Sequence, residues 1–105
     1  MSASTVTVPG NAITPIGSCA VFSAVPIGQI QISYQTSSAS ALQLQYVRDG
    51  STIQSNALST APNGTITDST QLAANSNHVI TVNAVNSTAL PVSGSFNISV
   101  ATQSV

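Results

Sequence analysis

The sequence predicts an all-β domain, folded as an antiparallel β-sandwich of seven strands. Along most of the chain, apolar and polar side chains alternate with a period of two, which is typical of strands that bury one face. Residues that favour turns separate these segments at short intervals. No long segment carries helical periodicity, and at most residues 71–75 form one helical turn.

Four segments carry the alternation most clearly. Residues 29–35 place two isoleucines and a tyrosine on one side, with glutamines and a serine on the other. Residues 41–47 repeat the pattern with two leucines and a tyrosine, and residues 95–102 do so with Phe, Ile and Val. Residues 78–85 are apolar on both sides, so we expect them to form a central strand.

Three shorter segments, residues 18–25, 51–55 and 64–67, complete the seven predicted strands. Residues 1–17 are expected to form an N-terminal strand or arm ahead of them, with a short strand at residues 5–8 that ends at Pro9-Gly10. One turn is predicted at Asp49-Gly50, because this dipeptide tolerates the positive φ angles of a tight hairpin. Pro62-Asn63-Gly64 predicts a second turn on the same grounds.

The whole chain, residues 1–105, is expected to be a single domain. Its hydrophobic content of 42% supports one core, and its formal net charge of −1 argues against intrinsic disorder. No apolar run reaches the roughly 20 residues of a membrane span, so we predict no membrane insertion. The N-terminus lacks a basic segment followed by an apolar core, so we predict no signal peptide in this chain.

Charged side chains are almost absent, because only Arg48, Asp49 and Asp68 carry a formal charge at neutral pH. A surface with so little charge cannot attract a polyanion, so we predict no nucleic-acid binding. A calcium site usually needs several carboxylates, and a zinc site needs several Cys or His ligands. We therefore expect no metal and no other cofactor.

One segment resembles a known family. Leu72 is followed six residues later by His78, which opens the alternating run His-Val-Ile-Thr-Val-Asn-Ala. This spacing resembles the corner and penultimate strand of fibronectin type III domains, which are immunoglobulin-like sandwiches. Their corner has a leucine, a short loop and a strand that starts Tyr-x-Val-x-Val-x-Ala.

The resemblance extends over residues 18–102. Ser33-Tyr34 is similar to the Ser-Trp of the family's second strand, residues 42–50 look like its third strand and turn, and residues 95–102 would be its last strand. The resemblance implies a binding, spacing or adhesive module, not an enzyme. It also implies that Leu72 and His78 form a structural corner, with His78 in place of the family's tyrosine.

His78 is the single imidazole of the chain, so it is the first candidate for catalysis. A serine–histidine pair needs a carboxylate to orient it, and only Asp49 and Asp68 could supply one. Because Asp49 sits in a turn, we interpret His78 as structural and predict no catalytic residues. A small serine hydrolase is the alternative from the enzyme class. We interpret the single cysteine, Cys19, as a small buried hydrophobe.

A contact surface is expected at Gln43, Gln45 and Arg48. The glutamines face outward on their strand, and Arg is enriched at interface hot spots. The simpler interpretation of Arg48 is a solvated ion pair with its neighbour Asp49. Carbohydrate is a weaker option for the glutamine-rich faces (Gln29 and Gln31 also point outward), because sugar binding usually also uses an exposed aromatic ring.

The partner is expected to be another protein or a second copy of the chain, joined through sheet edges, since no lysine protects them. Four prolines are the available edge blockers: Pro9, Pro15, Pro26 and Pro91. Our functional hypothesis is a secreted or cell-surface bacterial module for recognition or adhesion, which works through neutral polar faces and edges. The alternative is a structural subunit or decoration protein of a phage particle or pilus-like fibre.

Overall fold

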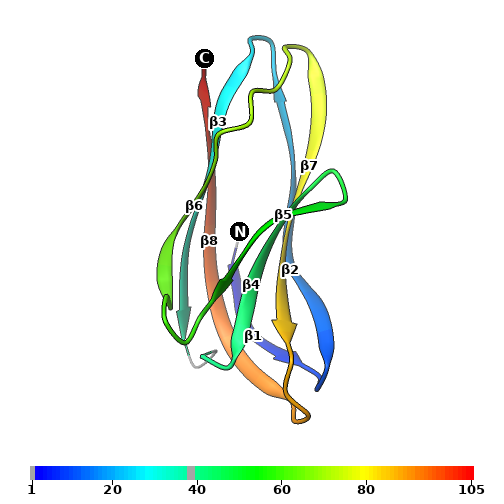
Figure 1. Cartoon of the computed structure of the whole chain (residues 1–105), viewed down its shortest axis with the longest axis vertical. Helices are drawn as coiled ribbons and strands as arrows, with labels where there is room; N and C mark the ends of the chain where they lie inside the picture. The colour runs from blue at the N-terminus through cyan, green and yellow to red at the C-terminus, as the bar shows by residue number, and fades with distance from the viewer. Residues whose placement is uncertain (1, 38–39) are drawn as a thin grey trace.

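Two antiparallel sheets pack face to face in the computed structural model, which describes residues 2–37 and 40–105 (Figure 1). Each sheet has four strands, and no helix is present in the described residues. The molecule is elongated along its strands, with extents of 44 × 22 × 20 Å. The predicted all-β sandwich is therefore confirmed.

The described residues form eight strands, so the prediction of seven is wrong by one. The strands are β1 (Ser2–Val8), β2 (Ala12–Ser23), β3 (Ile27–Ser37), β4 (Leu42–Arg48), β5 (Ser51–Ala57), β6 (Asn63–Asp68), β7 (Ser76–Asn86) and β8 (Val92–Ser104).

The error lies in the N-terminal residues, which were expected to form a strand or arm. Most of this segment forms β1 and the first half of β2, which begins at Ala12 and not at Ser18. The first half of β2 was not recognised in the sequence, because it contains Pro15 and Gly17 and both residue types are uncommon in strand interiors. The strand tolerates them at a sheet edge, where its register with β7 shifts between Pro15 and Gly17.

The strands pair in a nested order. β1 pairs with β8, β2 with β7, β3 with β6 and β4 with β5, while β3–β8 and β4–β7 contacts complete the two sheets. The resulting orders are β1-β8-β3-β6 and β2-β7-β4-β5. An eight-stranded double sheet wound in this nested way has the connectivity of a jelly roll.

This order differs from the one that the fibronectin resemblance implies. In immunoglobulin-type sandwiches the last strand shares a sheet with the penultimate strand. Here β8 lies between β1 and β3, and β7 lies between β2 and β4. The resemblance would place residues 95–102 beside residues 78–85, whereas the structure places these two strands in different sheets. Alternation fixes which face of a strand is buried, and it carries no information about the neighbouring strand.

The core is built from the alternate positions that the sequence predicts. Side chains of β3, β4, β7 and β8 that were expected to face inward are buried at 3% exposure or less, except Val100, which is only partly buried against the core. They are Ile30, Ile32, Tyr34, Leu42, Leu44, Tyr46, Ile80, Val82, Ala84, Phe96 and Ile98. The predicted central position of the strand at residues 78–85 is confirmed, because β7 has a neighbour on each side.

The predicted hairpin turn is also confirmed. Asp49 and Gly50 join β4 to β5 with φ angles of 52° and 83°, as a tight turn with two positive φ values requires. The other predicted turn is misplaced, because Asn63 and Gly64 already belong to β6. A Cβ atom at Gly64 would lie 3.1 Å from the Tyr34 hydroxyl, so this glycine allows the close packing of an aromatic ring.

All four sheet edges are interrupted in spite of the absence of lysine. β2 carries Pro15, and β6 carries the inward-pointing charge of Asp68. The registers of β1 and β5 are irregular, and Ile53 is the extra residue in β5. Proline, inward charge and bulges are devices that oppose strand addition. The expectation of contacts through sheet edges stays a prediction, because β1 covers β8 only as far as Asn97.

Candidate functional site

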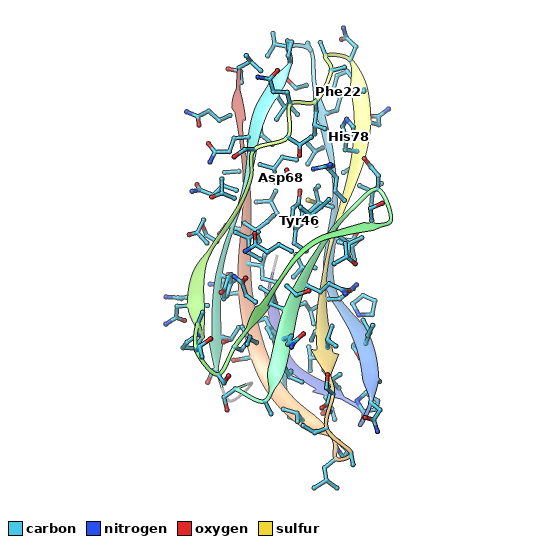
Figure 2. All side chains as sticks on the ribbon, viewed as in Figure 1. Phe22, Tyr46, Asp68 and His78 are labelled. Carbon is cyan, nitrogen blue, oxygen red and sulfur yellow. The ribbon has the colours of Figure 1, made fainter. Side chains whose placement is uncertain are left out.

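The carboxylate of Asp68 joins the two sheets in the interior (Figure 2). Its Oδ2 atom accepts a hydrogen bond of 2.7 Å from the Tyr46 hydroxyl and a second from the Arg48 guanidinium. Its Oδ1 atom accepts the Thr70 N–H at 3.1 Å. Asp68 ends β6 in one sheet, whereas Tyr46 and Arg48 belong to β4 in the other. One buried group thus fixes the distance between the sheets.

The ionisation of this cluster follows from its contacts. Burial, followed by the hydrogen bond to Asp68, raises the pKa of Tyr46, so the phenol stays protonated and donates. Burial alone would raise the pKa of Asp68, but hydrogen bonds from Tyr46, Thr70 and Arg48 outweigh it and lower that pKa. The Arg48 side chain is only 15% exposed. The predicted solvated pair of Arg48 with Asp49 is therefore wrong.

A second polar chain joins Ser76, His78 and Asp49. Ser76 Oγ lies 3.0 Å from His78 Nε2, and His78 Nδ1 lies 2.7 Å from Asp49 Oδ2. The Val79 N–H donates to Asp49 Oδ1 at 2.8 Å. The hydrogen bonds from His78 and Val79 lower the pKa of Asp49. The order serine–histidine–aspartate is that of the catalytic triad, and sequence reasoning missed it.

The single hydroxyl proton of Ser76 limits how these contacts can be made. Ser76 Oγ also donates to the Ala73 carbonyl at 2.7 Å, and it has only one proton. If His78 donates to Asp49 and is neutral, its Nε2 atom needs that same proton. With Ser76 donating to Ala73, this proton is not directed at Nε2. A nucleophilic serine needs the opposite arrangement, with its proton held by a free Nε2 lone pair.

The predicted corner residues occupy two separate contacts. Leu72 exchanges backbone hydrogen bonds of 2.8 and 2.9 Å with Ile27, which attaches the loop between β6 and β7 to the start of β3. His78 reaches the same loop only through Ser76, which bonds Ala73. Cys19 is free and lies partly buried against the core.

Of the predicted contact residues, Gln43 and Gln45 share the outer face of β4, whereas Arg48 points inward to Asp68. Gln45 accepts a hydrogen bond of 2.9 Å from Asn83. Gln43 is exposed, and its register partner in β7 is Val85.

The outer side of β3, β6 and β8, three strands of the sheet that also contains β1, has a different character, and we call it the polar face. Every side chain on it except the Ala101 methyl group can form hydrogen bonds, and none is charged. Its members are Gln29, Gln31, Ser33, Gln35, Asn63, Thr65, Thr67, Asn97, Ser99, Ala101 and Gln103. The glutamines of β3 were predicted to point outward. The pairing of β3 with β8, which brings the polar residues of the two strands together, depends on the topology and could not be predicted from alternation.

The carboxamides of this face are available to a ligand. Within residues 2–37 and 40–105, those of Gln29, Gln31, Gln35 and Gln103 have no side-chain hydrogen-bond partner in the protein. Each offers two donors and one acceptor. The Asn83 amide on the other sheet is different, because it is bonded to Gln45.

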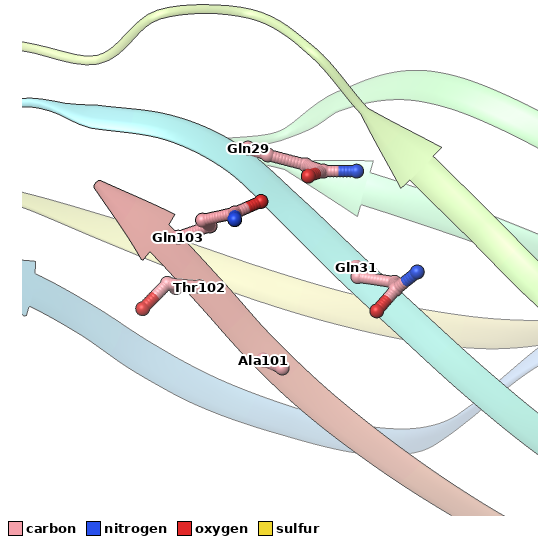
Figure 3. Close-up of a pocket in the computed structure, with 5 residues that line it drawn as sticks. All are labelled: Gln29, Gln31, Ala101, Thr102 and Gln103. Carbon is pink, nitrogen blue, oxygen red and sulfur yellow. The ribbon is translucent and has the colours of Figure 1, made fainter. Parts of the chain in front are cut away.

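Two shallow grooves lie along β3 and β8 on this face. The larger has a volume of about 320 Å³ and is lined by Gln29, Gln31, Ala101, Thr102 and Gln103 (Figure 3). The second, of about 240 Å³, is lined by Ser33, Tyr34, Gln35, Gly64, Asn97 and Ser99. A third groove, of about 300 Å³, lies on the other sheet around Ile13 and Val85. Ser76, His78 and Asp49 line none of the three.

No family model matches the chain, and a search of curated proteins finds no significant match. Among the described residues, no group of three or more His, Cys, Asp or Glu side chains is placed to hold a metal ion. The same residues contain no helix that is long and apolar enough to cross a membrane.

We predict that Asp68→Asn lowers the free energy of unfolding at pH 7 by about 3 kcal/mol, because Arg48 would lose its buried counter-charge. A carboxyl whose pKa is lowered on folding stabilises the protein above its unfolded pKa, near 4, and this contribution disappears as pH falls through the folded pKa. Wild-type stability should therefore drop below about pH 4, and the variant should show a shallower drop. Urea unfolding followed by circular dichroism measures both, since the chain has no Trp.

Asp49→Asn is the matched control, because this carboxylate is 43% exposed and should matter less. Equal pH slopes for wild type and Asp68→Asn between pH 5 and 2 would contradict the assignment.

We predict that His78→Ala and Ser76→Ala each lower stability by roughly 1 kcal/mol, the net worth of a hydrogen bond. Their effects should be less than additive, because both changes break the same contact. If the hydrogen bonds of Ser76, His78 and Asp49 are only structural, wild type and both variants should leave the hydrolysis of p-nitrophenyl acetate at the rate measured in buffer alone. Wild-type turnover that either variant abolishes would support the hydrolase.

Proposed function

We propose that this domain is a non-catalytic recognition or adhesion module that binds its target through the polar face. The observation that carries the proposal is the set of carboxamides on β3 and β8 without partners in the described structure. Amide groups that are not used inside the protein can exchange water for a ligand's hydrogen-bonding groups. Two shallow grooves along the same pair of strands make this face less flat than an ordinary sheet surface.

Binding at the polar face should also change little with the ionic strength and pH of the medium. This face carries no charged side chain, so binding there should depend little on ionic strength. Its glutamine, asparagine, serine and threonine groups do not titrate between acidic and basic pH. These properties support placement outside the cell or on its surface, where pH and salt vary.

The face is better suited to this role than the sheet edges. Each edge is interrupted by a proline, an inward charge or an irregular register, so a partner strand could pair over only a short length. Over residues 30–35 the backbone of β3 is already paired on both sides, which leaves its side chains to make the contact.

The test uses two serine-to-arginine variants, one on each outer face. Ser33→Arg places a large charged side chain in the second groove of the polar face, whereas Ser55→Arg places it on exposed β5 in the other sheet. We expect wild type to bind at least one member of a panel of neutral polysaccharides, acidic polysaccharides and surface proteins, equally at low and high salt.

Ser33→Arg should remove this binding, and Ser55→Arg should retain it. The proposal fails if no member binds, if salt abolishes binding, or if the two variants behave alike.

A second candidate function is a structural subunit of a larger assembly. It is favoured by apolar side chains on the outer face of β2 and β7, where Phe22, Val79 and Ile13 are 58%, 52% and 57% exposed. Ala20 lies opposite Val79, and Phe22 lies opposite Asn77, so Phe22 and Val79 are diagonal neighbours. Contiguous exposed apolar groups often mark protein–protein contacts.

For this candidate we predict that wild type associates near 1 mM in sedimentation velocity and that Phe22→Ser prevents it. The matched variant Ile53→Ser changes an exposed apolar side chain in β5 and should leave association unaltered. A monomer at all concentrations would exclude self-assembly through this patch.

A further inference from the structure

We propose that the outward side chains of β3 and β8 form a binding site for an uncharged, hydroxyl-rich chain, in chemical terms a neutral oligosaccharide. The inference rests on the proposed function and names the ligand class of the same face. The site, which we call the polar strip, consists of Gln29, Gln31, Ser33, Gln35, Asn97, Ser99, Ala101 and Gln103.

The register of the two strands arranges these groups as a ladder. Gln29 lies opposite Gln103, and Gln31 lies opposite Ala101. Further along, Ser33 lies opposite Ser99, and Gln35 lies opposite Asn97. Neighbouring strands are about 4.8 Å apart, and same-face residues repeat about every 6.7 Å along a strand. The strip therefore presents donors and acceptors at regular intervals.

The larger groove concentrates three of these carboxamides. Gln29 and Gln31 project from β3, and Gln103 projects from the end of β8 (Figure 3). Each amide can donate to one ligand oxygen and accept from a ligand hydroxyl. A sugar ring carries hydroxyl groups with both properties, and the Ala101 methyl group is small enough to leave room above the strand.

The absence of charge argues against an ionic ligand. A phosphate, sulfate or carboxylate is usually held by Arg, Lys or a helix N-terminus. The single Arg of the chain, Arg48, is engaged with buried Asp68. A charged ligand on the strip would lose water without gaining a counter-charge, which is unfavourable.

The absence of large apolar groups argues against a protein ligand on the strip. Protein interfaces are centred on aromatic or Arg anchors that become fully buried. The Tyr34 ring beneath the second groove is only 3% exposed, and its hydroxyl donates to the Ala61 carbonyl. A sugar on the strip would be held by hydrogen bonds, without the exposed aromatic ring that sugar sites usually add.

The length of the strip fits a ligand of several sugar rings. From Gln29 to Gln35 the strand rises about 20 Å, at roughly 3.3 Å per residue. The two grooves lie one after the other along this distance. Each contact is weak and exposed to water, so we expect a dissociation constant in the millimolar range for a short oligosaccharide. Several copies on one surface would raise the apparent affinity.

The experiment titrates ¹⁵N-labelled protein with neutral gluco-, xylo- and manno-oligosaccharides and follows the side-chain NH₂ signals. We expect at least one of the three sugars to shift the signals of Gln29, Gln31 and Gln103, with little change between low and high salt. The double variant Gln31→Ala/Gln103→Ala should weaken binding roughly tenfold or more, as loss of two direct hydrogen bonds implies. The matched control Gln43→Ala/Gln71→Ala removes two exposed amides elsewhere and should bind like wild type.

Dextran and dextran sulfate separate neutral from ionic recognition. Binding of the sulfated polymer alone would overturn the inference, as would the absence of shifts with all three neutral oligosaccharides. Shifts restricted to β2 and β7 would also overturn it. If a surface protein binds wild type and loses binding on Ser33→Arg while no sugar binds, the proposed function stands and this ligand assignment fails.

Discussion

The Asp68 carboxylate is the constraint on which the rest of the structure depends. It is the one charged group of β6, and it points into the sandwich to meet Tyr46 and Arg48 of the opposite sheet. The contact holds the sheets at a fixed separation and also protects the β6 edge. Since β6 pairs with β3 at the edge of the sheet, the contact of Asp68 with the opposite sheet also supports β3, the strand that carries most of the free glutamines. The only three formal charges of the chain are thus used in positioning, two of them in this cluster.

Two other polar clusters tie chain segments together. Asn86 is 1% exposed and donates to the carbonyls of Val8, Pro9 and Leu90, which joins the end of β7 to the turn after β1. Tyr34 accepts a hydrogen bond from Asn56, which joins β3 to β5 across the sandwich. In these two clusters, neutral hydrogen-bonding groups connect separate chain segments, a role that ion pairs often have in other domains. They cost less to bury than isolated charges, provided that each finds a partner.

The sequence predicted what depends on local pattern and missed what depends on pairing. Alternation identified the buried residues of β3, β4, β7 and β8, and the Asp49-Gly50 turn was located because its φ angles restrict the residues that fit. The partner of Arg48 could not be predicted, since Asp68 reaches it only when the two sheets pack. The contact of His78 with Asp49 likewise depends on the position of the β4–β5 turn beside β7. No local signal identified β3 as the neighbour of β8, and this pairing creates the polar strip.

The polar composition of the chain alone does not explain the polar face. The outer face of the other sheet is drawn from the same composition, yet it exposes Ile13, Phe22 and Val79 and carries the Asp49 turn at its end. Solvation alone would be served by any mixture of polar groups, charged ones included, and soluble surfaces usually contain both signs of charge. One face has neither charges nor large apolar groups, whereas the other has apolar patches. This asymmetry is the physical reason to assign recognition of an uncharged ligand to β3 and β8 and any contact between copies to β2 and β7.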